Sequence, residues 1–285
     1  MDALFTSQQC TDFIRRSLQE DLGSGDHSSL AAIPQGTQGK ARLLLKDDGI
    51  LAGLELGVAI FKEVDPALKV ELLLKDGDKV KKGDVGLTVE GSVHSILKSE
   101  RLVLNCMQRM SGIATITNKI VSKLEGLHSR ILDTRKTTPG LRFLEKWAVK
   151  VGGGYNHRIG LYDMVMLKDN HVDYAGGITA AVEGTKKYLA EKGLDLKIEV
   201  ETRNVQEVNE VLQAGGVHRV MFDNFTPELM KEAVKLVNGR LETEASGGII
   251  IENVREYAET GVDFISIGAL THSVKSLDIS LKEYK

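Results

Sequence analysis

The chain has 285 residues, of which 42% are hydrophobic and 27% charged, and its 37 Lys and Arg residues nearly balance 40 Asp and Glu residues. This size predicts one large or two smaller globular domains with a substantial core. The formal net charge of −3 argues against nucleic-acid binding through overall charge, so any anion site must be local.

The amino-terminal segment and the two cysteines predict a soluble, cytoplasmic protein. Residues 1–23 carry charges from Asp2 to Glu20 and have no apolar core, unlike a secretory signal. No uncharged apolar run reaches the roughly 18 residues that span a bilayer. Cys10 and Cys106 lie far apart without a metal-binding pattern, which argues against a disulfide scaffold or a structural zinc site.

Residues 1–110 are predicted to form an α/β domain with an antiparallel sheet. Short strand-like runs are separated by Asp-Gly and Lys-Gly turns, in KARLLLKDDGILAG, KVELLLKDGDKVKKGD and VGLTVEG. Helices are predicted for GLELGVAIFKEV and VHSILKSERLVLNCMQRM. The turns in DGDKVKKGD also resemble lipoyl- or biotin-carrier hairpins, but no modification motif accompanies them, and we interpret them as structural turns.

Residues 111–270 show a different pattern, in which short apolar runs alternate with helical stretches. The six predicted strands are RILD, MVMLK, KIEVE, RVMFDN, LETEAS and VDFISIG. The predicted helices between them are LRFLEKWAVK, ITAAVEGTKKYLAEKG, NVQEVNEVLQAGG, TPELMKEAVKLVNG and ENVREYAETG. The last three begin at Asn or Thr caps and end at Gly. This alternation predicts parallel β/α units, and six units predict an incomplete or distorted barrel.

Active sites of β/α barrels form at the carboxyl ends of the strands. These ends carry Asp133 with Arg135 and Lys136, Lys168 with Asp169, Glu199 with Glu201, Asp223, Ser246 and Gly268. Because strand side chains alternate, Glu199 and Glu201 point to the same side and Val200 points away. Buried carboxylates in an otherwise apolar interior need cations to offset them.

The segment DTRKTTPGLR supplies candidates for that offset in Arg135, Lys136 and Arg142. Two simpler interpretations remain open, because Arg135 and Lys136 could lie in a solvated loop, and Glu201 could pair with a structural lysine. His157 in GGGYNHR is a weak indication alone, although Arg158 and the glycines beside it suit an anion.

Two glycine turns follow the last two predicted strands. In EASGGIIIENV, Ser246, Gly247 and Gly248 are predicted to precede a helix whose amino terminus faces the strand ends, which is typical of a phosphate site. The second turn, in SIGALTHS, contains Gly268. Barrel phosphate sites often use the loops of the final two strands.

Eight stretches of the chain resemble the quinolinate phosphoribosyltransferase (nicotinate-nucleotide pyrophosphorylase) family. They follow the family's order over nearly the whole chain, and are EDLGSGDHSS, SERLVLNCMQRMSGIAT, DTRKTTPGLR, GGGYNHRIGLYDMVMLKDNH, IEVE, MFDN, EASGGI and ISIGALTHS. The chain departs from the family where Thr is usual after GDx, since Ser28 and Ser29 stand there and retain a hydroxyl.

The resemblance implies a fold and a reaction. The fold would be an amino-terminal α/β sandwich, residues 1–110, joined by the tail 271–285, and an open α/β barrel of about seven strands, residues 111–270. The reaction would transfer ribose 5-phosphate from phosphoribosyl pyrophosphate to quinolinate with loss of a carboxylate. Its products would be nicotinate mononucleotide, pyrophosphate and CO₂, in NAD biosynthesis.

The resemblance also implies roles for individual residues. The quinolinate pocket would be lined by Arg101, Arg135, His157, Arg158 and Lys168. The phosphoribosyl pyrophosphate site would comprise Lys136, Glu201, Asp223, Ser246, Gly247, Gly248, Gly268 and His272. The catalytic residues would be Lys136, Lys168, Glu201 and Asp223. Mg²⁺ would be held mainly through the substrate, near Glu201 and Asp223.

By the same resemblance the protein would form a two-fold dimer in which Arg101 comes from the neighbouring subunit, with assembly into a hexamer left open. No nucleic acid or membrane partner is expected. Two other readings remain: a Schiff-base lyase with Lys168 as nucleophile, and a differently specialised relative, such as a molybdenum-transport-associated protein.

Overall fold

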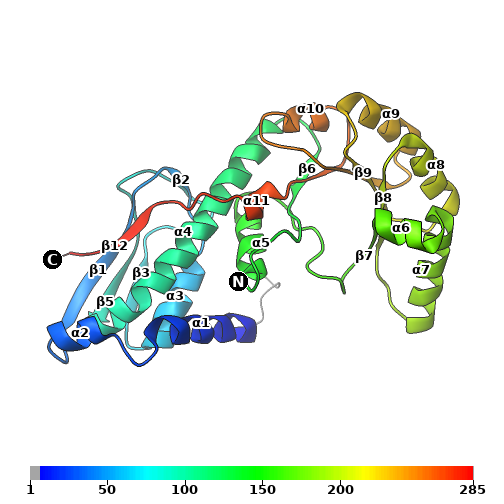
Figure 1. Ribbon diagram of the computed structural model, residues 1–285. Helices are drawn as coiled ribbons and strands as arrows, with labels where there is room; N and C mark the ends of the chain where they lie inside the picture. The colour runs from blue at the N-terminus through cyan, green and yellow to red at the C-terminus, as the bar shows by residue number, and fades with distance from the viewer. Residues whose placement is uncertain (1–6, 285) are drawn as a thin grey trace. The chain divides into compact units, whose positions relative to one another are not determined.

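The computed structural model describes residues 7–284 (Figure 1), and the chain divides into two compact units. The first contains the described residues up to Asn118, the segment Thr138–Gly153 and the described residues from Ser273. The second contains Lys119–Thr137 and Gly154–His272. Residues 1–6 of the segment predicted not to be a secretory signal lie outside the described part.

The first unit contains an antiparallel sheet with the strand order β12-β1-β5-β3. Its strands are β1 (Gln38–Leu45), β3 (Lys69–Leu72), β5 (Val85–Ser92) and β12 (Ile279–Glu283). In β1, Leu43 and Leu45 are fully buried while the residues between them are more exposed, as expected for a sheet with one face on a core. The tail pairs with β1 through β12.

Two further strands, β2 (Gly49–Ile50) and β4 (Lys79–Val80), pair with each other. The turns on either side of β4 are closed by carboxylates, since Asp78 accepts the N–H of Lys75 and Asp84 that of Lys81. The segment DGDKVKKGD thus forms structural turns, as predicted.

The helices of the first unit are α1 (Ser7–Leu22), α2 (His27–Ala32), α3 (Leu54–Val64), α4 (Val93–Lys123) and α5 (Arg142–Val151). Helix α3 packs closely on α4: a Cβ at Gly57 would lie 3.3 Å from the sulfur of Met107. Helix α4 continues past residue 110 without a break, so the predicted boundary at 110/111 lies inside it. The last residues of α4 belong to the second unit, and α5, predicted in the barrel, belongs to the first.

The second unit is built on a parallel sheet with the strand order β6-β11-β10-β9-β8-β7. Its strands are β6 (Arg130–Leu132), β7 (Val165–Leu167), β8 (Ile198–Thr202), β9 (Arg219–Asp223), β10 (Glu242–Ser246) and β11 (Phe264–Ser266). All six predicted strands are therefore confirmed. Beyond β6, Tyr155 adds a single parallel bridge to Leu132, with hydrogen bonds of 2.8 and 3.1 Å to the β6 segment. Within residues 7–284 no pairing joins β6 to β7, so the predicted incomplete barrel is confirmed.

The helices α6 to α10 of this unit lie outside the sheet, and α11 follows the end of β11 (Figure 1). They are α6 (Asp169–Ala175), α7 (Ile178–Lys192), α8 (Val205–Ala214), α9 (Pro227–Val237), α10 (Val254–Ala258) and α11 (Ala269–His272). The predicted caps hold for α8 and α9, where the side chains of Asn204 and Thr226 accept backbone N–H groups.

For α10 the predicted N-cap position is confirmed at Asn253, but the Asn253 side chain makes no cap hydrogen bond to this five-residue helix. It begins at Val254, well after Gly248, so no helix amino terminus directly follows the Ser-Gly-Gly turn.

Candidate active site

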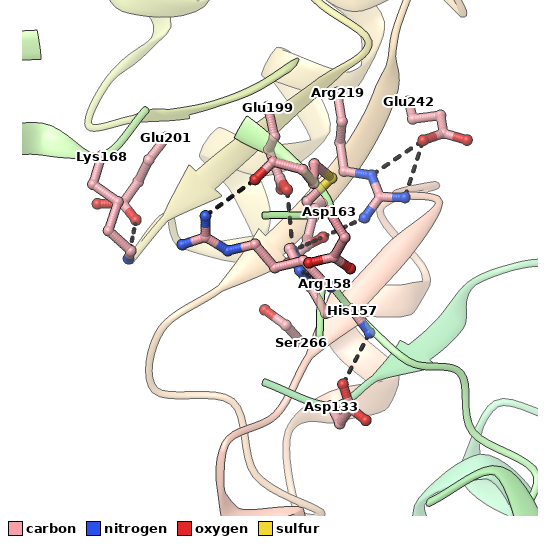
Figure 2. A network of polar contacts seen from close by, with 12 residues as sticks. Asp133, His157, Arg158, Asp163, Lys168, Glu199, Glu201, Arg219, Glu242 and Ser266 are labelled. Atoms are coloured by element: carbon pink, nitrogen blue, oxygen red, sulfur yellow. Dashed lines mark hydrogen bonds and ion pairs between the residues drawn. The ribbon is translucent and has the colours of Figure 1, made fainter. Parts of the chain in front are cut away.

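The segment after β6 and the loop carrying His157 and Arg158 form one polar cluster (Figure 2). Asp133, fully buried at the end of β6, accepts the backbone N–H of His157 at 2.9 Å and the side-chain amide of Asn156 at 2.5 Å. The N–H of Arg158 in turn donates to Nδ1 of His157, at 2.7 Å. The two predicted residues His157 and Arg158 are thus fixed through the main chain by the β6 strand end.

Arg158 lies close to Arg135, so two predicted site cations share one environment. Burial lowers the pKa of Arg158, and the positive charge of Arg135 lowers it further. Two guanidinium groups that repel each other in a half-buried place favour an anionic ligand between them. Lys136, next in sequence, is exposed, and Arg142 belongs to α5 in the other unit.

Two buried carboxylates, Glu199 of β8 and Glu244 of β10, lie next to His157. Figure 2 labels Glu199 close to His157. Nε2 of His157 is 3.0 Å from Oε2 of Glu199 and 3.4 Å from Oε2 of Glu244. Arg219 of β9 completes this polar layer, with Nη1 2.9 Å from the same Glu244 oxygen. The barrel interior is therefore charged at this level, which corrects the prediction that it is otherwise apolar.

Glu244 and Arg219 are not among the residues predicted for the site from the sequence. The alternation of Glu242, Glu244 and Ser246 along β10 is the pattern that could have revealed the first. Arg219 begins its strand, and only the sheet register, which aligns it with Glu199 and Glu242, reveals its neighbours.

In this layer, burial and the neighbouring charged groups shift the pKa values of Glu199, Glu244 and His157. Burial and the neighbouring Glu244 raise the pKa of Glu199 to about 7. Burial also acts to raise the pKa of Glu244, but His157 and Arg219 outweigh it and the pKa is lowered. For His157, burial lowers the pKa, while hydrogen bonds and charge from Glu199 and Glu244 outweigh it and raise the pKa.

Ligand atoms of His157, Glu199 and Glu244 lie within 4.8 Å of one another, a spacing that a metal ion could use. However, Arg219 is already bonded to Glu244, and the charge of Glu199 acts on both Arg219 and Arg158. A divalent cation would have to compete with these guanidinium groups, so we interpret the cluster as a proton-sharing network rather than a metal site.

A second cluster joins β7, β8 and β9. Nζ of Lys168 lies 2.9 Å from Oε2 of Glu201, and Asp223 ends the next strand. Burial raises the pKa of Asp223, and the Glu201 carboxylate raises it further. Glu199 and Glu201 thus each contact a predicted site residue, His157 and Lys168 respectively. The lysine that pairs with Glu201 is itself a predicted site residue.

The predicted phosphate-site turns follow the adjacent strands β10 and β11, and Lys136 follows the next strand, β6. A Cβ at Gly268 would be 2.8 Å from Cδ of Lys136 and 3.2 Å from Cδ2 of His272. The hydroxyl of Thr271 donates to the carbonyl oxygen of Lys136 at 2.8 Å, which fixes this turn.

The turn after β10 is equally tight. Gly247 and Gly248 have φ values of +93° and +62°, in the region that favours glycine. A side chain at Gly247 would collide with Asn224. The carbonyl oxygen of Ser246 also accepts the N–H of Asn224, which places this turn beside Asp223. The turn therefore presents backbone groups at the strand ends, although the predicted helix amino terminus is absent there.

Arg101 lies in α4, in the first unit, whereas the other predicted site residues belong to the second unit. Its side chain is 55% exposed, and Nη2 lies 3.2 Å from the carboxylate of Glu100. Glu100 is the adjacent residue in the sequence. Arg101 also lines a cavity of about 460 Å³ within the first unit, together with Arg109 and Cys106.

Comparison with protein families identifies the chain. Residues 26–111 match the N-terminal domain of quinolinate phosphoribosyl transferase, and residues 113–282 match the C-terminal domain. The chain belongs to the quinolinate phosphoribosyltransferase family. The junction of the two family domains lies next to the boundary at 110/111, inside α4.

Individual members of the quinolinate phosphoribosyltransferase family are similar over most of their length. The chloroplastic nicotinate-nucleotide pyrophosphorylase (carboxylating) of Arabidopsis thaliana is 51% identical, over 94% of this chain and 81% of the relative. A probable nicotinate-nucleotide pyrophosphorylase of Bacillus subtilis is 45% identical, over 92% and 89%. The solved nicotinate-nucleotide pyrophosphorylase of Francisella tularensis superposes with a TM-score of 0.93 at 37% identity, and each chain is fully covered.

Proposed function

We propose that the strand ends of the parallel sheet are the active site of a quinolinate phosphoribosyltransferase that makes nicotinate mononucleotide, pyrophosphate and CO₂. The two family domains match residues 26–111 and 113–282 of the chain. The relatives in Arabidopsis thaliana and Bacillus subtilis are named for this activity. The observation that carries the proposal is the separation of charge at the sheet edge. Cations cluster around Arg158, and carboxylates with one lysine cluster around Glu201.

The cationic cluster suits quinolinate, which carries two adjacent carboxylates. Arg135 and Arg158 would each bind a carboxylate, because a guanidinium pairs with it through two parallel hydrogen bonds. Their mutual repulsion would be relieved when the dianion binds. His157 would help to hold this pocket by accepting the backbone N–H of Arg158. Lys168, which contacts Glu201, would line the side of the pocket next to the carboxylate cluster.

The carboxylate cluster suits the sugar of phosphoribosyl pyrophosphate. Glu201 and Asp223 would accept hydrogen bonds from the ribose hydroxyls and favour the positive charge that develops on the ring as pyrophosphate leaves. Lys136 would stabilise the departing pyrophosphate, and the turns at Ser246 and Gly268 would hold the 5-phosphate together with Gly247, Gly248 and His272. No covalent nucleophile is needed, because the ring nitrogen attacks the anomeric carbon directly.

We also propose that Mg²⁺ takes part, bound mainly to phosphoribosyl pyrophosphate near Glu201 and Asp223. Carboxylate oxygens are the protein ligands that Mg²⁺ prefers, and the raised pKa of Asp223 shows a carboxylate that lacks full compensation by cations. The ion would supply charge neutralisation at the pyrophosphate.

The assembly and location belong to the same proposal. We propose a two-fold homodimer in which Arg101 of each subunit completes the quinolinate pocket of the other; a hexamer of such dimers remains open. Within residues 7–284 no helix combines the length and hydrophobicity needed to cross a bilayer. The cytoplasmic location stays a prediction, since the Arabidopsis thaliana relative is named as chloroplastic.

The rival lyase interpretation is disfavoured by one contact. Nζ of Lys168 is paired with Glu201 at 2.9 Å, whereas a Schiff-base lysine must direct a free amine at its carbonyl substrate. Borohydride trapping of a carbonyl substrate would reveal a lyase, and calorimetry with quinolinate would expose a relative of different specificity.

The decisive experiment is an assay of the purified protein with quinolinate, phosphoribosyl pyrophosphate and Mg²⁺. Nicotinate mononucleotide and CO₂ are expected in equal amounts, and omission of Mg²⁺ with added chelator should abolish turnover. If neither product forms while the protein is folded, the proposed function is wrong.

Replacing Asp223 with Asn should lower kcat at least about 100-fold, the scale of losing one charge that stabilises the transition state. Quinolinate affinity should change less than about threefold, because Asp223 belongs to the carboxylate cluster and not to the cationic one. Calorimetric titration with quinolinate beside steady-state kinetics separates the two quantities. An equal loss of affinity and turnover would contradict this assignment.

A further inference from the structure

The imidazole of His157 uses both of its nitrogens within the protein. Nδ1 accepts the N–H of Arg158 at 2.7 Å, so a proton on Nδ1 would set two donors against each other. This contact opposes the protonation of the ring that Glu199 and Glu244 favour by raising the pKa of His157. In a neutral ring the proton is then on Nε2, which faces Glu199 at 3.0 Å and Glu244 at 3.4 Å. The residue's own N–H donates to Asp133. The ring therefore links the buried carboxylates to the main chain of Arg158.

Glu199 and Glu244 are costly to keep in this place. Both are fully buried, and two carboxylates that share one neighbourhood repel each other. Arg219 offsets the charge of Glu244, and His157 contacts both carboxylates. A buried charge layer often contributes less to stability than apolar residues of the same volume would, so its contact with a predicted binding loop points to a role in that loop.

We propose that Glu199 and Glu244 are positioning residues for the quinolinate pocket: they hold the His157 ring in the Nε2–H tautomer so that Nδ1 fixes the backbone of Arg158. This inference rests on the proposed function. Nothing in it requires either carboxylate to touch substrate. A carboxylate that accepts the proton-bearing nitrogen of a neutral imidazole leaves the other ring nitrogen free to accept a hydrogen bond, as in other histidine–carboxylate pairs.

The test compares Glu199→Gln and Glu244→Gln with a matched control, Glu242→Gln. Glu242 lies in the same strand as Glu244 and accepts a hydrogen bond from Arg219 at 3.0 Å. Among the contacts described for residues 7–284, none joins Glu242 to His157. Gln keeps the size of the side chain, so the three variants differ mainly in which carboxylate charge is lost.

In steady-state kinetics, Glu199→Gln and Glu244→Gln should each raise KM for quinolinate about tenfold, the loss of about 1.4 kcal/mol. KM for phosphoribosyl pyrophosphate should change less than twofold, because its proposed site lies on other loops. The control variant should match the wild type in both. Equal rises in both KM values, or no difference from Glu242→Gln, would overturn the proposal.

A second measurement does not depend on activity. In ¹⁵N NMR of histidine-labelled protein, with the His157 resonances identified by their loss in His157→Gln, the neutral ring at alkaline pH should carry its proton on Nε2. Each of the two Glu→Gln variants should lower the pKa of His157, since each removes a carboxylate that raises it, and Glu242→Gln should not.

A neutral ring with its proton on Nδ1 would overturn the inference even in a fully active enzyme. If the wild type makes no nicotinate mononucleotide but shows the expected tautomer and shifts, the proposed function fails while the network stands. If a variant does not fold, as judged by circular dichroism, the tautomer of the wild type still decides.

Discussion

Nicotinate should be used at least about 10⁴-fold less efficiently than quinolinate, as the ratio of kcat/KM. A site built to pair with a charged group rejects an analogue that lacks the group by this order, because its own buried polar atoms are left unpaired. Here the unpaired atoms would belong to Arg135 and Arg158, which already repel each other in the free protein. Nicotinate has one carboxylate and would leave part of this repulsion uncompensated.

The measurement is direct, because both acids would yield the same product, and only quinolinate would release CO₂. An Arg158→Gln variant serves as the comparison: it should lose most of its activity with quinolinate and little of its weak activity with nicotinate, so that the ratio falls. Comparable use of the two acids by the wild type would contradict the assignment of this pocket to a dicarboxylate.

Mixing two inactive variants should restore activity if Arg101 acts across a dimer interface. Arg101→Ala and Lys168→Ala are each expected to lower turnover at least about 100-fold, since each removes a cation that faces substrate charge. In a heterodimer of the two, one site would have both residues intact and the other neither. Random exchange between equal amounts makes half of the dimers mixed, so about a quarter of the wild-type activity should return.

The experiment is performed by refolding the two variants together, with different tags to purify the mixed dimer. Glu100→Ala is the matched control on α4, because it removes only the neighbour that contacts Arg101 and should neither abolish activity nor need a partner. If pure mixed dimers remain as inactive as the parents, Arg101 acts within its own chain or has no role in the site.

Several features of this protein follow from local sequence. The six parallel strands are short apolar runs that end in polar residues, and their hydrophobic pattern was sufficient to predict them. The same holds for the caps at Asn204 and Thr226, since a cap is made by residues within one helical turn. Alternation along β8 likewise put Glu199 and Glu201 on one side.

Other features depend on which strands become neighbours. The Ser-Gly-Gly turn lies tightly against Asn224, a residue of another loop, and the local sequence does not reveal this contact. The domain boundary predicted at 110/111 lies inside α4, because this helix continues unbroken from Val93 to Lys123.

The chemistry-bearing residue types were readable from the sequence, because strand ends and glycine turns mark where such residues gather. Only the tertiary structure decided their partners. The sheet order β6-β11-β10-β9-β8-β7 brings Glu244 and Arg219 beneath His157, and it separates the cations around Arg158 from the carboxylates around Asp223. Electrostatic interactions act through space over a few ångströms. The pairing of residues more than 40 positions apart, such as His157 with Glu199 and Glu244, is therefore a property of strand order and not of spacing along the chain.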